Sequence, residues 1–199
     1  MRTRAILFPL LAGAALLTRS AWAHPGHAAH DFSSGVAHPI FGLDHLLAML
    51  AVGLWAVQLG GRALWAVPCT FVGVMALGGA CGMNGLELPA VESGIAVSVL
   101  LLGLLIAGAF KLPLYVSAGL TAAFAFCHGC AHGAELPAGA SGLAFAGGFV
   151  VATALLHGAG IGLAVALRKT QLPQSVLRGA GAAIAVAGVA LLVNVLAGA

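Results

Sequence analysis

Six long apolar segments, joined by short connections, constrain this chain more than any other feature of its sequence. They lie at residues 38–60, 63–83, 91–110, 112–133, 142–167 and 176–198. An α-helix needs roughly 20 apolar residues to cross a bilayer. The chain is 61% hydrophobic and only 7% charged, a balance that a soluble fold of this length could not keep in solution. We therefore expect an all-α polytopic membrane protein whose residues 38–199 form a compact bundle of about six transmembrane helices.

Residues 1–23 have the pattern of a cleavable signal peptide. Two arginines precede a short apolar core, which is followed by an A-x-A cleavage site at residues 21–23. The apolar core of about 13 residues is shorter than a membrane span. The alternative is an uncleaved first helix.

Cleavage would leave an external tail over residues 24–37. His24, His27 and His30 are three residues apart in this tail. They are either accessory groups that collect metal ions or incidental residues of a solvated segment.

The basic residues predict how the bundle is oriented. With the mature N-terminus outside, every lysine and arginine after residue 23 falls in a cytoplasmic connection, as the positive-inside rule requires. Glu87, Glu92 and Glu135 then lie outside, and so does the C-terminus. The small net charge of +3 and the absence of a basic cluster predict no nucleic-acid partner.

An internal repeat at an offset of 48 residues links two external turns. Residues 85–96 (GLELPAVESGIA) match residues 133–144 (GAELPAGASGLA). The repeat predicts parallel helical hairpins at spans 2–3 and 4–5, an arrangement common in transporters. Chance convergence of two G-x-E-L-P turns is the alternative. His128 and His132 align with Ala80 and Asn84, so any site built from the second hairpin should be asymmetric.

The end of span 4 has the spacing of a metal-binding helix. His128 and His132 are four residues apart and therefore project from one face, about 6 Å apart along the axis. Two imidazoles at this spacing can bind one ion. Glu135 could add a carboxylate oxygen if the helix unwinds at Gly133. The alternative is a pair of structural histidines bonded to carbonyls.

The start of span 1 supplies further candidate ligands. If Pro39 lies in the first turn of the helix, His38 is a boundary residue about 10 Å from His45, too far to share an ion without a bend. Gly42 could supply that bend. Asp44 points about 100° away from His45 and is either a ligand or a carboxylate that orients an imidazole. Met49 is an accessory candidate that is more typical of a core.

Other polar residues have weaker claims. His157, near the middle of span 5, is a further metal ligand, a relay on the path, a proton acceptor or a satisfied core histidine. Glu92 either attracts cations or caps its helix. The four cysteines are helix-packing residues or soft metal contacts, and their context does not fit a haem or redox motif.

Two motifs resemble the signatures of the HupE/UreJ family of nickel/cobalt permeases. They are H-P-x-x-G-x-D-H-x-x-x-M-x-x-V-G-x-x-A at residues 38–56 and F-A-x-x-H-G-x-A-H-G-x-E-x-P at residues 124–137. The resemblance implies uptake of Ni²⁺ or Co²⁺ through the inner membrane of a bacterium, with both mature termini periplasmic, to supply hydrogenase, urease or cobalamin pathways. The candidate residues that it implies are His38, Asp44, His45, His128, His132 and Glu135.

The sequence thus favours a secondary transporter or permease whose metal site lies between spans 1 and 4, completed by residues of both. It contains no ATP-binding motif, and we expect no tightly bound cofactor besides the transported ion. An intramembrane metallohydrolase with a zinc-bound water is the alternative. A haem-binding membrane protein is a third interpretation.

Overall fold

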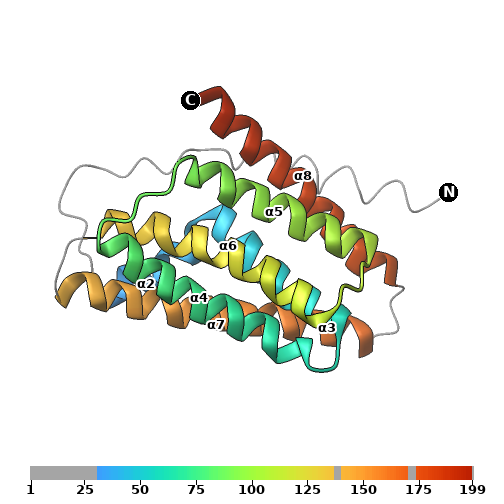
Figure 1. The fold of residues 1–199 in the computed structure, drawn as a ribbon. Coiled ribbons are helices and arrows are strands. Elements are labelled where there is room, and N and C mark those ends of the chain that lie inside the picture. The colour runs from blue at the N-terminus through green and yellow to red at the C-terminus, as the bar shows by residue number, and fades with distance from the viewer. Residues whose placement is uncertain (1–30, 137–139, 170–173, 199) are drawn as a thin grey trace.

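The structure, a computed structural model, describes residues 31–136, 140–169 and 174–198. The predicted signal peptide and His24, His27 and His30 lie outside the described residues. The described part is all-helical, as predicted, with no strand (Figure 1). Its helices are α2 (Phe32–Phe41), α3 (Leu43–Leu59), α4 (Ala63–Met83), α5 (Val91–Gly108), α6 (Leu114–Glu135), α7 (Ala140–Lys169) and α8 (Gln174–Gly198).

Five of these helices, α4 to α8, are each long and apolar enough to cross a membrane. The sixth candidate span is the pair α2 and α3, which meet at an angle of 80°. These helices match the six predicted apolar segments. The chain is therefore a polytopic helical membrane protein.

The first span differs from the predicted single helix. α2 already begins at Phe32, inside the predicted tail, and its N-terminus is capped by Asp31, which accepts a hydrogen bond from the backbone N–H of Ser34. Pro39 is the eighth of the ten residues of α2, so its predicted place in a first helical turn was wrong. A proline this deep in a helix removes the hydrogen bond to the carbonyl four residues earlier and weakens the turn that precedes it.

Gly42 separates the two helices, as the sequence allowed. Its backbone is extended, with φ −74° and ψ 111°, so it ends α2 and precedes α3. Its N–H donates to the carbonyl of His38, and its own carbonyl accepts from the N–H of Leu46. Because one residue serves both helices, the chain turns sharply without leaving these groups unpaired.

Helix α3 is the centre of the bundle. Residues 51–58 are buried without interruption, and α3 packs against α4, α5, α7 and α8. The other extensive pairs are α4 with α6, α5 with α8, and α2 with α7. In Figure 1, α5 and α8 lie side by side along one side of the bundle. An apolar central helix with all sides covered by other helices needs no polar face.

Glycines bring α4 and α6 into close contact. A Cβ atom at Gly129 or Gly133 would collide with the backbone of α4 near Gly79, and one at Gly78 or Gly82 would collide with the backbone of α6. In the sequence, Gly129 and Gly133 have the G-x-x-x-G spacing that predicts close packing of helices in lipid, and the structure confirms this prediction.

Gly158 and Gly162 have the same G-x-x-x-G spacing, which predicts close packing there too, but this prediction was wrong. Nothing lies within 4 Å of a Cβ atom built on either residue. It is Gly160 of α7 that packs closely, against Leu50 and Gly53 of α3.

The predicted helical hairpins remain a prediction. The two helices of each proposed hairpin, α4 with α5 and α6 with α7, are not among the closely packed pairs. Instead, the first helices of the two copies, α4 and α6, pack against each other. If the repeat is real, its copies are interleaved within the bundle.

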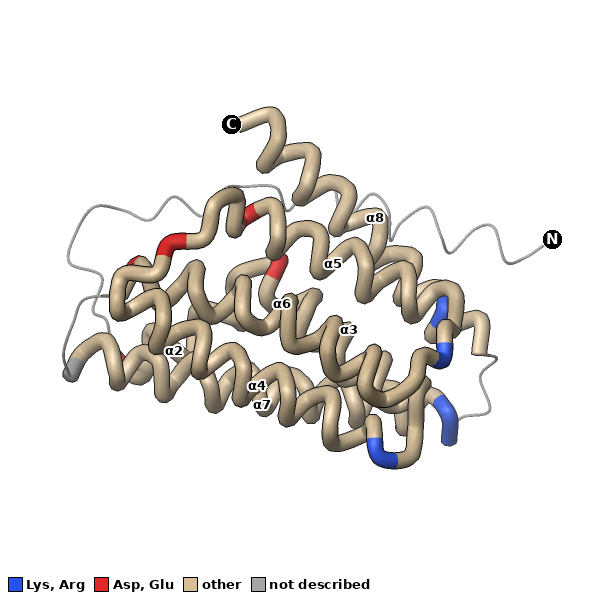
Figure 2. Tube along the Cα trace, viewed as in Figure 1, with Lys and Arg blue, Asp and Glu red and all other residues tan. Residues whose placement is uncertain are grey.

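Charged residues are separated along the bundle. Figure 2 shows the described lysines and arginines at one end and the acidic residues toward the other end. Two of the arginines contribute to the packing there, because Arg168 donates to the carbonyl of Val57 and Arg178 to that of Ala107. The separation agrees with the orientation expected from the positive-inside rule.

Candidate metal centre

Three imidazoles from three different helices lie together near the acidic end of the bundle. His38 of α2, His45 of α3 and His132 of α6 each have a ring nitrogen within 4.8 Å of the other two. The ring centroids are 4.5 Å apart for His45 and His132 and 4.7 Å apart for His38 and His132. Imidazole nitrogens bind transition metals at about 2.0–2.1 Å, so side chains this close can share one ion after small adjustments.

The predicted contact between spans 1 and 4 is confirmed by His45 and His132. Their Nε2 atoms are 2.5 Å apart. Two nitrogen lone pairs aimed at the same point repel each other unless a proton or a cation lies between them. This pair therefore holds either a proton, shared as an N–H···N hydrogen bond, or a cation between its two nitrogens.

The bend at Gly42 brings His38 into the cluster. The rings of His38 and His45 are 5.4 Å apart. On a straight helix these residues would be too far apart to share an ion, and the bend that Gly42 could supply is present. Because the chain turns by 80° between α2 and α3, the two side chains converge.

Asp44 orients His45, which is one of the two roles that the sequence left open. Its Oδ1 atom is 2.7 Å from Nδ1 of His45 and also accepts the backbone N–H of His45 at 2.8 Å. The expectation that Asp44 faces away from His45 was wrong. A carboxylate accepts the Nδ1 proton, which leaves the Nε2 lone pair of His45 free for a metal ion.

Glu135 lies beside the cluster rather than inside it. Helix α6 does not unwind at Gly133 but continues to Glu135. The Oε2 atom of Glu135 is 3.7 Å from Nδ1 of His132, and 69% of its side chain is exposed. It therefore faces the ring nitrogen of His132 that points away from His45, where it can orient this imidazole.

His128 is adjacent to the cluster but not among its three members. Its ring is 5.2 Å from that of His45. Its Nδ1 atom is 2.9 Å from the carbonyl oxygen of Phe124, and because a carbonyl only accepts, Nδ1 carries the proton. Its buried Nε2 atom then has no partner, which costs about 1–3 kcal/mol for a buried polar group.

Two phenylalanines of α7 line the cluster. The ring of Phe149 is 5.2 Å from that of His132 and 5.7 Å from that of His38, and Phe145 is also 5.7 Å from His38. Sequence reasoning missed both. Their spacing of four residues on an apolar helix was the available signal, but it is equally typical of ordinary core packing.

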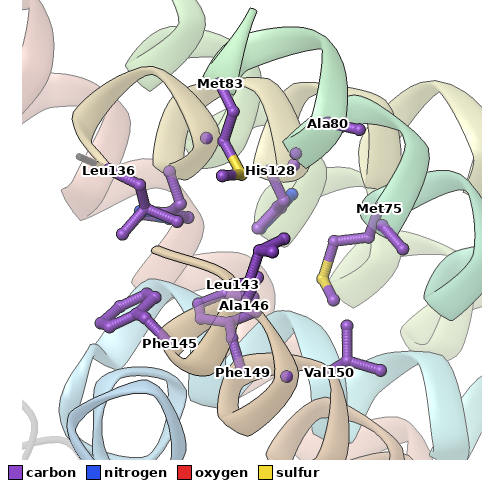
Figure 3. Close-up of a pocket in the computed structure, with 16 residues that line it drawn as sticks. Met75, Ala80, Met83, His128, Leu136, Leu143, Phe145, Ala146, Phe149 and Val150 are labelled. Carbon is purple, nitrogen blue, oxygen red and sulfur yellow. The ribbon is translucent and has the colours of Figure 1, made fainter. Parts of the chain in front are cut away.

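A pocket of about 280 Å³ lies next to the cluster between α4, α6 and α7. His128 and His132 line it, together with mainly apolar side chains. Figure 3 shows Met75 and Met83 on the opposite side of this pocket from Phe145 and Phe149. The pocket gives the two histidines of α6 a cavity between three helices.

The remaining candidates lie apart from the three histidines. The side chain of Met49 is fully buried in the core, and its carbonyl accepts from Nδ1 of His157 at 2.9 Å. Glu92 is exposed in the first turn of α5. The four cysteines are free, and none belongs to the metal-binding group found in the described part of the chain.

Fold and site together define a helical membrane protein with a histidine cluster suited to a transition-metal ion. Comparison with known proteins gives the family. The HupE / UreJ protein family model matches residues 12–191. A protein named HupE, from Rhizobium leguminosarum bv. viciae, is 49% identical over 174 residues, which cover 87% of this chain and 91% of that relative. The chain belongs to the HupE/UreJ family. No solved structure matches it significantly.

Proposed function

We propose that this protein takes up divalent transition-metal ions, Ni²⁺ or Co²⁺, across the inner membrane of a bacterium. The observation that carries the proposal is the cluster of His38, His45 and His132, with Asp44 fixing the tautomer of His45. Polar groups at membrane depth are costly and are usually kept for function. Membership of the HupE/UreJ family supports the same proposal.

The ligand chemistry favours these ions. Imidazole nitrogens suit Ni²⁺, Co²⁺, Zn²⁺ and Cu²⁺, whereas Mg²⁺ and Ca²⁺ prefer oxygen ligands. The Irving–Williams order makes Cu²⁺ bind such a set at least as strongly as Ni²⁺ or Co²⁺. Selection among them must therefore depend on the geometry of the site and on which ion is supplied.

The charge distribution supports an orientation that favours uptake. With the basic end of the bundle in the cytoplasm, the histidine cluster faces the periplasmic side, and both mature termini are periplasmic. The external carboxylates Glu87, Glu92 and Glu135, with the tail histidines, then attract cations toward the cluster. The membrane potential, negative inside, favours inward movement of a divalent cation, so the protein acts as a secondary transporter or a channel-like permease. The imported metal supplies hydrogenase, urease or cobalamin pathways.

Uptake of labelled metal tests this function. Cells that express the protein should accumulate labelled Ni²⁺ or Co²⁺ above the empty-vector level, and competition by Zn²⁺, Cu²⁺ and Mn²⁺ should rank its selectivity. His132→Ala should abolish the accumulation, whereas Cys69→Ala, a truncation at an exposed residue of α4, should not. Accumulation that is unchanged in His132→Ala would contradict the proposal.

A further inference from the structure

Four buried polar atoms that lack a partner lie deeper in the bundle than the histidine cluster. They are Nε2 of His128, Nε2 of His157, Oγ1 of Thr121 and Oε1 of Gln58. In the described residues, only one other buried side-chain atom has no partner, and that atom belongs to the cluster itself, in His132. Buried polar groups are nearly always paired, so such a concentration in the helices around the cluster requires an explanation.

The two deeper histidines are held in the same way as His45. Nδ1 of His128 donates to the carbonyl of Phe124, and Nδ1 of His157 donates to the carbonyl of Met49, each at 2.9 Å. Both imidazoles thus carry their proton on Nδ1 and keep a free lone pair on Nε2. Histidines that bind metals typically donate their other ring nitrogen in this manner.

A chain of ring contacts joins these residues to the cluster. The ring of His128 is 5.2 Å from that of His45 on one side and 5.6 Å from that of Phe71 on the other. The ring of Phe71 is in turn 5.1 Å from that of His157. Phe71, His128 and His157 are all almost completely buried. The three side chains come from α4, α6 and α7, so the contacts cross the middle of the bundle.

The other two atoms without a partner, in Thr121 and Gln58, continue this path toward the basic end of the bundle. Thr121 precedes His128 by seven residues on α6, which places it about 10 Å closer to the end that carries Lys111. Gln58 lies on the last turn of α3, beyond Met49 and next to the loop with Arg62. Gln58 donates to the carbonyl of Ile106 but has no donor for its own Oε1 atom, so this oxygen can accept from water or bind a cation.

We propose that His157 forms a second, inner metal station, reached from the three-histidine cluster by way of His128 and past the ring of Phe71. This inference rests on the proposed transport function and specifies its path. A divalent ion leaves the cluster, passes the free Nε2 atom of His128, binds the free Nε2 atom of His157 with water as the additional ligands, and continues past Thr121 and Gln58 to the cytoplasm. The face of the Phe71 ring attracts a passing cation.

Two parallel measurements on the full-length protein, Co²⁺ binding and metal uptake, test the inner station. Purified protein in lipid nanodiscs is titrated with Co²⁺, whose visible absorption reports nitrogen coordination, and uptake is measured in parallel in cells. The wild type should bind two Co²⁺ ions per chain. His157→Ala should lose one of them, keep the other, and reduce uptake about tenfold or more.

Two further variants control for damage to the fold. His157→Asn keeps a donor for the carbonyl of Met49 but lacks the imidazole, and it should behave like His157→Ala. Ser98→Ala removes a buried hydroxyl that bonds only within its own helix, to Ile95, and should retain both ions and normal uptake.

The outcomes separate this inference from the transport function. If the wild type transports metal and His132→Ala does not, but both His157 variants bind two ions and transport normally, the inner station is wrong and the function stands. A single bound Co²⁺ in the wild type also overturns the inner station. If the wild type neither binds nor accumulates the metal, both proposals fail.

Discussion

At the scale of single residues, Asp44 has the clearest role. It acts through His45 and does not need to contact the ion itself. It accepts two hydrogen bonds from His45, one from the ring and one from the backbone. Its negative charge therefore strengthens the imidazole as a ligand and fixes the ring in one orientation. The carboxylate is partly buried, with 27% of its side chain exposed, so solvent screens this interaction only in part.

Asp44→Asn should weaken metal binding about 10- to 100-fold, the range typical for the loss of a partner that orients a ligand. The amide can still accept one hydrogen bond, so the fold should persist. Isothermal titration with Ni²⁺ measures the effect. Tyr115→Phe, which removes an exposed hydroxyl in the first turn of α6, outside the cluster, is the control. An affinity equal to that of the wild type would contradict the role of Asp44.

The residues of the site could largely be identified from the sequence, but their geometry could not. Polar residues are rare in this chain, so His38, Asp44, His45 and His132 stood out once the apolar segments were assigned. Ideal helical geometry then placed His38 and Asp44 away from His45. For His38 it failed because the 80° turn at Gly42 depends on how α2 packs against α7, and side-chain spacing within one segment does not report such packing. For Asp44 it failed because the side chain turns toward the ring of the next residue, His45, and helical spacing does not fix side-chain torsions.

At the scale of helices, close packing of α4 on α6 holds His132 against the rest of the cluster. On α6, Gly129 lies three residues before His132 and Gly133 lies directly after it. Both contact the backbone of α4. Without side chains at these positions, the helices approach more closely than other residues permit. The position of His132 thus depends on residues that bind nothing themselves.

Gly129→Ala should destabilise the protein by about 1–3 kcal/mol, because the added methyl group overpacks the contact with Met75 and Gly79. Gly158→Ala is the matched control: its Cβ would meet no atom within 4 Å, so helix propensity alone should make it neutral or slightly stabilising. Thermal unfolding in detergent compares them. Equal stability of the two variants would contradict the packing of α4 on α6.

The sequence predicted the helices well and their partners poorly. The six apolar segments reappear as the bent pair α2 and α3 and as α4 to α8, because length and hydrophobicity suffice to define a membrane span. Which helices pack together depends on shape complementarity, and Gly158 and Gly162 had the same spacing as Gly129 and Gly133 but face open space. Spacing therefore does not distinguish a packed face from an exposed one.

At the scale of the whole molecule, the separation of charges predicts the orientation in the membrane. The described basic residues lie at one end of the bundle, and the C-terminal helix α8 runs away from that end (Figure 2). Positively charged loops remain in the cytoplasm. The C-terminus should consequently face the periplasm.

Alkaline phosphatase fused to the C-terminus should therefore be active, because this enzyme folds only outside the cytoplasm, where disulfides form. The same reporter fused after Arg62, in the loop between α3 and α4, should be inactive. The opposite pattern would reverse the orientation and place the histidine cluster on the cytoplasmic side.

The central claim is that His38, His45 and His132 together hold the transported ion. X-ray absorption spectroscopy of the protein loaded with one equivalent of Ni²⁺ measures this most directly, because it counts the imidazoles bound to the metal. We predict three imidazoles for the wild type and two for His38→Ala. A wild-type spectrum with only oxygen ligands, or one that is unchanged in the variant, would contradict the claim.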